Sequence, residues 1–150
     1  MPTLSVKRPI LAQLFVVVLA ALALAAGHAH AGPPEGFVVR TLVSGLSQPT
    51  SFERAPDGRI FIAQKSGLIR VWRDGALSTY LDMRGEVNAY SDRGLLGIAL
   101  DPAFATNRWV YVVYTVESDA ANPDRLTPTT NRLIRVRSTA AAPGVADPGS

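Results

Sequence analysis

The chain of 150 residues contains no cysteine, and its two histidines, His28 and His30, both lie near the amino terminus. Without cysteine there is no disulfide framework and no site for lipid attachment after export. Without histidine, residues 32–150 lack the usual base of several catalytic arrangements, including the one that activates a serine nucleophile. The arginines are spread along the chain without a cluster, which argues against a nucleic-acid partner.

Residues 1–31 have the pattern of a secretory signal peptide. Lys7 and Arg8 form a basic start, residues 10–26 are almost entirely apolar, and the sequence Ala-His-Ala occupies positions 29–31. This order of basic, apolar and small residues is typical of a leader that is removed. The alternative is an uncleaved anchor, for which the apolar run is slightly short. We therefore expect a periplasmic or secreted protein with no stable membrane span after cleavage.

Loss of this leader also changes the charge of the chain. The formal charge of the whole sequence is +3, and it falls to +1 without Lys7 and Arg8. The high pI of the whole chain therefore gives no support to a nucleic-acid function.

Short runs of β-branched and aromatic residues follow, separated by turn residues. Proline and glycine flank Asp57, and Asp74-Gly75 is a typical hairpin pair. The pattern predicts one four-stranded antiparallel sheet. Its strands are expected at residues 50–54, 59–64, 68–72 and 77–81, and residues 37–43 are also strand-like.

The pattern then repeats. Leu-Ile-Arg-Val at residues 68–71 recurs at residues 133–136, and Pro56 and Pro102 lie 46 residues apart. This spacing is close to that of one propeller blade. Further strands are expected at residues 95–100, 109–115 and 133–137, with a turn over residues 101–107 and a long polar loop over residues 117–130. The sequence thus predicts an all-β protein built of antiparallel four-stranded blades.

Residues 92–99 read Asp-Arg-Gly-Leu-Leu-Gly-Ile-Ala, and Asp-Pro-x-Phe-x-x-Asn follows at residues 101–107, before the strand Val-Tyr-Val-x-Tyr. From about Gly36 to about Arg137 the chain resembles the glucose/sorbosone dehydrogenase family. The resemblance implies a six-bladed β-propeller that uses pyrroloquinoline quinone (PQQ) and calcium. It also implies oxidation of a sugar at C1. A histidine in a later blade would take the hydroxyl proton, and the hydride would pass to the quinone and on to an external electron acceptor.

Asp92 is the candidate cofactor-binding residue. The resemblance places it where glucose-oxidising members have a glutamine that contacts the quinone. A carboxylate cannot donate the hydrogen bonds of an amide, and the alternative is a surface loop with an Asp92–Arg93 pair. No catalytic residue and no metal ligand is assigned to this chain. Asp57, Asp74 and Asp101 are expected to cap turns.

Three functions remain open from the sequence. The first is an exported sugar dehydrogenase, the second is a non-catalytic propeller similar to hedgehog-interacting proteins, and the third is a calcium-dependent lactonase-type propeller. Two blades cannot close a propeller ring. We therefore expect residues 32–137 to be the amino-terminal part of a longer propeller, with a flexible Ala/Pro/Gly tail over residues 138–150, and we expect the fragment alone to be inactive.

The signal-peptide interpretation predicts cleavage after Ala31. Amino-terminal sequencing of the exported protein should therefore read Gly32 as its first residue. A membrane-bound chain that still begins at Met1 would contradict this interpretation.

Overall fold

A computed structural model describes residues 32–139, 144–147 and 150. The predicted leader, residues 1–31, lies outside the described residues. The chain divides into two compact units, Met1–Arg40 and Thr41–Ser150. In the described part of the first unit, the backbone N–H of Phe37 donates to the carbonyl of Pro34 at 3.0 Å. All strands belong to the second unit.

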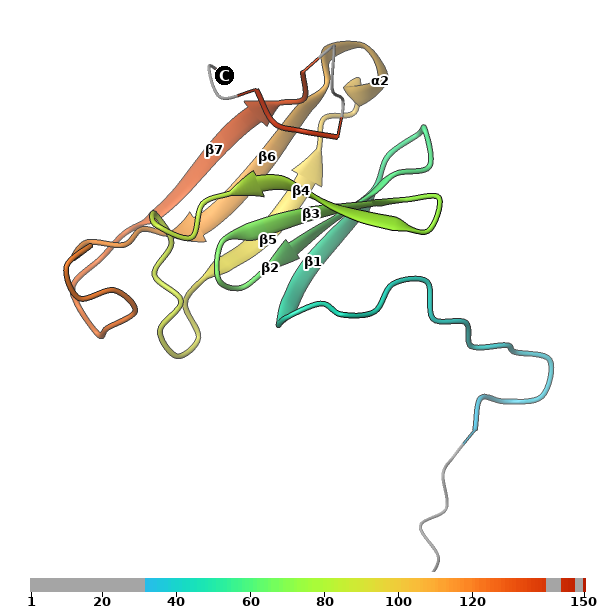
Figure 1. The fold of residues 1–150 in the computed structure, drawn as a ribbon, viewed down its shortest axis with the longest axis horizontal. Helices are drawn as coiled ribbons and strands as arrows, with labels where there is room; N and C mark the ends of the chain where they lie inside the picture. Colours follow the sequence, from blue (N-terminus) through green and yellow to red (C-terminus); the bar gives the residue numbers. More distant parts are fainter. Residues whose placement is uncertain (1–31, 140–143, 148–149) are drawn as a thin grey trace, which may run out of the picture. The chain divides into compact units, whose positions relative to one another are not determined.

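The first sheet has four antiparallel strands in the order β1-β2-β3-β4 (Figure 1). They are β1 (Pro49–Arg54), β2 (Ile60–Gln64), β3 (Leu68–Arg73) and β4 (Ala76–Asp82). The turns between them follow the predicted chemistry. Gly58 donates its N–H to the carbonyl of Ala55 at 3.0 Å, and Asp74 and Gly75 have φ values of 50° and 84°, as a hairpin turn of this type requires.

The second sheet has three antiparallel strands in the order β5-β6-β7. They are β5 (Leu95–Leu100), β6 (Trp109–Thr115) and β7 (Asn131–Arg137). A one-turn helix, α2 (Phe104–Asn107), lies between β5 and β6, where the sequence predicted only a turn. Its αL residue Arg108, with φ 60°, donates its N–H to the carbonyl of Phe104 and ends the helix.

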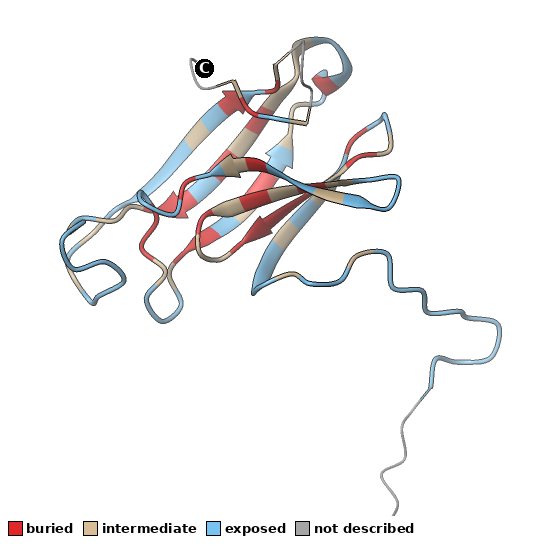
Figure 2. Cartoon of the chain, viewed as in Figure 1, coloured by how far each residue is buried: buried red, intermediate tan, exposed pale blue. Residues whose placement is uncertain are grey.

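One hydrophobic core lies between the two sheets. Alternate residues of the central strands point into it, because successive side chains of a strand face opposite sides. Phe61 of β2 is fully buried, and its ring meets the rings of Tyr80 and Phe104 edge to face, at centroid distances of 4.9 and 5.6 Å. Val110, Val112 and Tyr114 of β6 are the corresponding buried residues of the second sheet. Figure 2 shows buried positions in red on strands of both sheets.

One strand prediction needs correction. Residues 37–43 form no strand, because strand-like side chains alone are insufficient without a partner edge. In the described part of the chain only one face of β6 is covered, and Val113 on the other face is 38% exposed.

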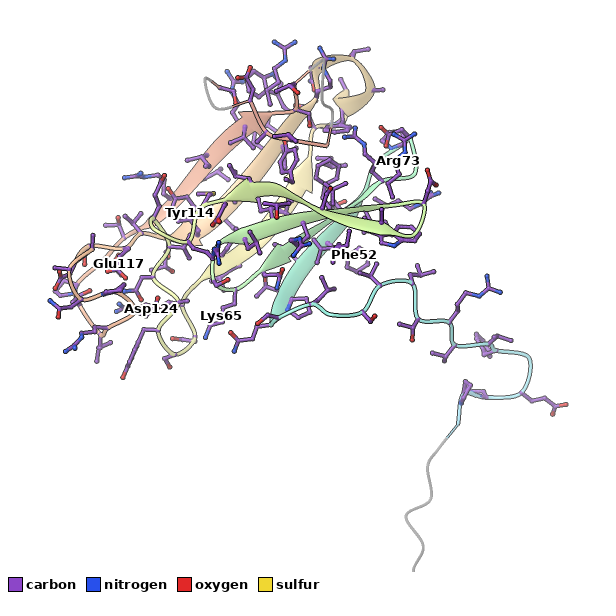
Figure 3. The ribbon with its side chains drawn as sticks, viewed as in Figure 1. Phe52, Lys65, Arg73, Tyr114, Glu117 and Asp124 are labelled. Carbon is purple, nitrogen blue, oxygen red and sulfur yellow. The ribbon has the colours of Figure 1, made fainter. Side chains whose placement is uncertain are left out.

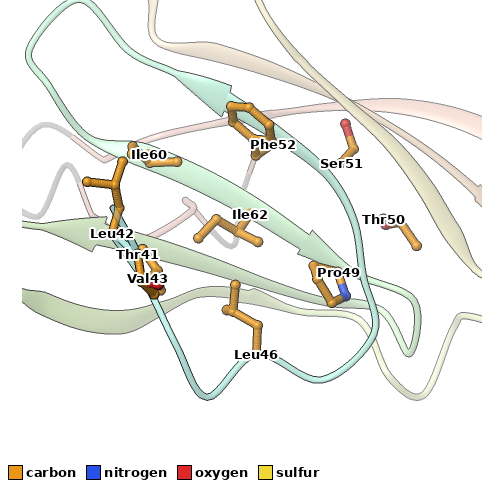
Figure 4. Close-up of a pocket in the computed structure, with 10 residues that line it drawn as sticks. All are labelled: Thr41, Leu42, Val43, Leu46, Pro49, Thr50, Ser51, Phe52, Ile60 and Ile62. Carbon is orange, nitrogen blue, oxygen red and sulfur yellow. The ribbon is translucent and has the colours of Figure 1, made fainter. Parts of the chain in front are cut away.

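Each sheet therefore has a second, apolar face. On the first sheet, Phe52 is 70% exposed and borders an open pocket of about 450 Å³ (Figure 4). Leu42 and Leu46 of the lead-in segment and Ile62 of β2 line the same pocket. On the second sheet, Val113 and Leu133 border a smaller apolar pocket of about 210 Å³. Within the described residues, no helix has the length and apolar character needed to cross a membrane.

The position of Phe61 predicts a large stability difference between two phenylalanines. Phe61→Ala should lower the free energy of unfolding by about 3–5 kcal/mol, because it removes a buried ring from the core between the sheets. Phe52→Ala is the matched control, and it should change the same quantity by less than about 0.5 kcal/mol. Denaturant titrations of the two variants measure both values. Equal effects would contradict the described core.

Candidate functional site

Asp92 lies in a tight turn over residues 90–93, just before β5. The N–H of Arg93 donates to the carbonyl of Tyr90 at 2.9 Å, and Ser91 has a φ of 52°. Asp92 is exposed, and none of the hydrogen bonds or ion pairs found among the described residues involves its carboxylate. The Asp92–Arg93 pair of the alternative interpretation is not among them. Asp92 borders a pocket of about 330 Å³. The other residues that line it are Arg93, Leu96, Thr115, Thr129 and Asn131.

This turn is joined to the first sheet at Lys65, the residue that follows β2. The carbonyl of Lys65 accepts the N–H of Leu95 at 2.9 Å, and its own N–H donates to the carbonyl of Gln48 at 3.0 Å. Its ammonium group donates to the carbonyl of Ser91. Gly94 makes the close approach possible, because a Cβ there would lie 2.7 Å from the carbonyl oxygen of Lys65. Gly94 also has a φ of 143°, which side chains rarely adopt.

The turn is also joined to the long polar loop over residues 117–130. Nη1 of Arg93 donates to the carbonyl of Thr127 at 2.9 Å and to that of Arg125 at 3.3 Å. Guanidinium groups suit this role because their N–H groups form a rigid, planar fork. Figure 3 shows that Lys65, Glu117 and Asp124 lie towards the same end of the sheets, away from the hairpin that carries Arg73.

Glu117 organises the near half of that loop. One carboxylate oxygen accepts the N–H of Asp119 at 3.0 Å, and the other accepts the N–H of Asp124 at 2.8 Å. These bonds hold the pKa of the Glu117 carboxyl below its ordinary value of 4.5, because they favour the charged form. The fully buried Asn88 donates its amide to Glu117 at 3.0 Å and to the carbonyl of Arg125 at 3.1 Å. Asp124 in turn accepts the N–H of Ala89.

The other candidate aspartates act mainly within their own turns, as expected. Asp57 accepts the N–H of Arg59 at 3.2 Å, and Asp101 accepts the N–H of Ala103 at 2.9 Å. The side chain of Arg59 also holds the pKa of the Asp57 carboxyl below its ordinary value. Asp74 forms an exposed ion pair with Arg73 at 3.4 Å.

Comparison with known proteins identifies the class. Residues 46–144 match the glucose/sorbosone dehydrogenase family. Over 94 residues, covering 57% of this chain and 23% of the relative, the chain is 33% identical to an uncharacterized protein of Synechocystis. Over 90 residues, covering 54% of this chain and 13% of the relative, it is 33% identical to the mouse hedgehog-interacting protein.

Solved structures indicate the same class of protein. An oxidoreductase of Thermus thermophilus, described as a glucose dehydrogenase, matches with a TM-score of 0.58 and 34% identity, covering 72% of this chain and 29% of that one. The PQQ-bound aldose sugar dehydrogenase of Streptomyces coelicolor matches with a TM-score of 0.57 and 26% identity. The match covers 74% of this chain and 32% of that protein's chain. The two sheets are thus about two blades of the β-propeller of these dehydrogenases. The chain belongs to the glucose/sorbosone dehydrogenase family.

The chain spans only 13% to 32% of the lengths of these four proteins. The all-β, propeller-blade prediction is confirmed, and so is the resemblance on which it partly rested. The second blade has the three strands that the sequence predicted for it.

The residues around Asp92 do not by themselves fit PQQ, a quinone that carries several carboxylates. In residues 86–93 and 117–130 acidic side chains outnumber basic ones, even when the nearby Lys65 is counted. The acidic residues are Glu86, Asp92, Glu117, Asp119 and Asp124. The ammonium of Lys65 and the guanidinium of Arg93 already bind backbone carbonyls. For calcium, the described residues contain no cluster of three or more side chains suited to a metal ion.

Sequence reasoning found the turn that carries Asp92 but missed the residues that hold it. Lys65 carried no local sign of its contact with Ser91, and Arg93 was considered only as the partner of Asp92 in the alternative interpretation. Asn88 and Glu117 carried no pattern of their own. The one signal in the sequence was the position of Gln64-Lys65 at the end of a predicted central strand.

The approach of Gly94 to Lys65 predicts a specific glycine requirement. A strained backbone alone is expected to lower the free energy of unfolding by about 1–3 kcal/mol. Gly94→Ala should lower it by more than this, because the new methyl group also meets the carbonyl of Lys65. Gly75→Ala is the control, since Gly75 has a φ of 84° and no atom within 4 Å of a Cβ. Thermal or chemical unfolding measures both. Equal losses would show that the close approach is absent.

Proposed function

We propose that this chain is the amino-terminal part of an exported quinoprotein aldose dehydrogenase, and that Asp92 lies at the rim of its cofactor site. The likeness of its two blades to a PQQ-bound aldose sugar dehydrogenase supports the proposal most directly. The family match over residues 46–144 supports the same class. The leader-like residues 1–31 support export to the periplasm or beyond.

In this proposal the chain supplies one wall of the site and other blades supply the rest. Sugar, PQQ, calcium and an external electron acceptor would be the partners of the longer protein. The acidic surroundings of Asp92 require that the basic groups for an anionic quinone come from those other blades. Thr115, Thr129 and Asn131 are the neutral polar residues in the pocket beside Asp92. The hydroxyl of Thr115 already donates to the amide oxygen of Asn131 at 2.9 Å, and that of Thr129 donates to the carbonyl of Val116.

A second candidate is a non-catalytic propeller that binds a protein or a glycan. The identity of 33% to the mouse hedgehog-interacting protein favours it. Asp92 is consistent with it, because a carboxylate replaces the amide that the family resemblance associates with the quinone. The two candidates differ in whether the longer protein binds PQQ at all.

The dehydrogenase proposal predicts that residues 32–150 alone do not oxidise glucose or other aldoses. These residues contain no histidine, and a base with a pKa near neutrality is needed to take the hydroxyl proton. The measurement is dye-linked reduction by the purified chain with sugar, PQQ and calcium. Quinone-dependent turnover by the chain itself would show that its own residues carry the chemistry.

The binding of PQQ provides the matching test of the site. Equilibrium titration of the longer protein in the presence of calcium should show that Asp92→Asn binds the quinone more tightly than the wild type, because the substitution removes a negative charge and restores an amide. Asp74→Asn, which lies in a distant hairpin, is the charge-matched control. A longer protein that binds no PQQ, with or without Asp92→Asn, would favour the binding-module alternative.

A further inference from the structure

The sequence contains two Asp-Gly pairs, and both lie in turns of the first sheet. Asp57-Gly58 lies between β1 and β2, and Asp74-Gly75 lies between β3 and β4. An Asp-Gly pair is prone to rearrange, because glycine has no side chain to hinder the approach of its own backbone nitrogen to the aspartate side chain. Whether the reaction occurs in a folded protein depends on how that nitrogen and that side chain are held, and the two pairs differ in both respects.

The rearrangement requires only the chain and water. The backbone nitrogen of the glycine attacks Cγ of the protonated aspartic acid, and the N–H proton and the carboxyl hydroxyl leave together as water. The product is a succinimide ring. Water then adds to one of the ring carbonyls and breaks its bond to the nitrogen. Opening at the side-chain carbonyl restores aspartate, whereas opening at the main-chain carbonyl leaves the chain running through Cβ and Cγ, which is isoaspartate.

Both reacting groups of the first pair are held by other bonds. The two carboxylate oxygens of Asp57 accept the Nε–H of Arg59 at 3.1 and 2.8 Å, and Nη2 of the same guanidinium lies 2.8 Å from Oδ2. The Arg59 side chain is only 4% exposed, so it is a fixed partner. It holds the pKa of the Asp57 carboxyl below its ordinary value, which leaves less of the protonated acid that can lose water. The N–H of Gly58 donates to the carbonyl of Ala55 at 3.0 Å.

The second pair has no comparable restraint. Among the described residues, the carboxylate of Asp74 has one partner, Arg73, through a 3.4 Å ion pair in which the Asp74 side chain is 91% exposed. An exposed pair of this kind holds a side chain weakly. No hydrogen bond among the same residues involves the N–H of Gly75, and no atom lies within 4 Å of a Cβ built there. Local opening of this exposed tip therefore lets the nitrogen reach Cγ without the loss of a core contact.

We propose that Asp74-Gly75 is a site of isoaspartate formation in the folded protein, and that the bonds from Arg59 to Asp57 protect the other pair. This inference does not depend on the proposed function. Isoaspartate adds one carbon to the backbone at the tip of the β3–β4 hairpin, where a two-residue turn needs a defined φ at both positions.

The change is expected to stay within the hairpin tip. Behind the tip, β4 pairs with β3, and Arg70 braces β4 by donating to the carbonyls of Ser78 and Leu77 at 3.1 and 3.3 Å. Isoaspartate also bears a free carboxylate on its Cα. Isoaspartate-specific carboxyl methyltransferases act on that group, so the rearranged hairpin presents the substrate of this class of repair enzyme.

Ageing of the purified protein at physiological pH and temperature tests the proposal. Chymotrypsin cleaves after Phe52, Phe61, Trp72 and Tyr80, which places the two pairs in separate peptides, residues 53–61 and 73–80. Mass spectrometry with electron-based fragmentation then distinguishes isoaspartate from aspartate in each peptide. Isoaspartate should accumulate at least about tenfold faster in residues 73–80, because the reaction of Asp57 must first break charge-assisted hydrogen bonds. No isoaspartate at Asp74, or equal rates in the two peptides, would overturn the proposal.

The same experiment in denaturant separates the effect of the fold from that of the sequence. Unfolding removes the bonds from Arg59 and from Ala55, so Asp57 should then react at a rate similar to that of Asp74. A difference that persists in the unfolded chain would contradict the proposal, since the neighbouring residue types would then determine the two rates.

A substitution in the reacting pair gives the second test. Gly75→Ala should abolish most of the isoaspartate at Asp74, because the new methyl group hinders attack by the adjacent nitrogen. Gly85→Ala is the matched control. Gly85 lies in the next turn, also with no atom within 4 Å of a Cβ, and the substitution should leave the rate unchanged. An isoaspartate-specific methyltransferase with labelled S-adenosylmethionine should label the aged wild type and Gly85→Ala but not Gly75→Ala. Equal labelling of all three proteins would contradict the assignment to Asp74.

Discussion

The arrangement of both blades depends on one backbone junction, the hydrogen bond from Leu95 to the carbonyl of Lys65 at 2.9 Å. It fixes the start of β5 against the end of β2. The hydroxyl of Thr50 reinforces it by donating to the carbonyls of Leu95 and Ala63, at 2.8 and 3.3 Å. Glycine at position 94 is what lets the two backbones meet. The Asp92 turn precedes this junction immediately, so packing of the blades and placement of the candidate site have the same cause.

Most of the fold was predictable because it depends on residues that lie close together in the sequence. The Asp74-Gly75 hairpin needs positive φ at both positions, and that requirement is visible in the residue types. The repeated Leu-Ile-Arg-Val run marks equivalent strands, since Ile69 and Val71, on either side of Arg70, are both buried as one inward face requires. Residues 37–43 have the same composition but form no strand. Whether such a segment becomes a strand depends on pairing with the edge of a neighbouring strand, and composition does not show whether that edge is present.

The site was less predictable because its contacts join residues far apart in sequence. Lys65 and Ser91 are 26 positions apart, and Arg93 and Thr127 are 34 apart. No local pattern distinguishes a lysine that reaches a distant carbonyl from one that is solvated. The motif around Gly94 was recognisable, but its physical purpose appears only when the backbone of the preceding blade lies against it. The position of Asp92 followed from the motif, whereas the absence of an internal partner required the structure.

Residue-resolved hydrogen exchange of the unmodified chain tests this account most directly. If the Leu95–Lys65 bond joins the blades, the amide of Leu95 should be as strongly protected as amides at the centres of β2 and β6, because it opens only when the blades separate. Exchange of Leu95 at the rate of exposed loop amides, such as that of Leu126, would contradict the account. It would show that the blades meet without the junction on which the Asp92 turn depends.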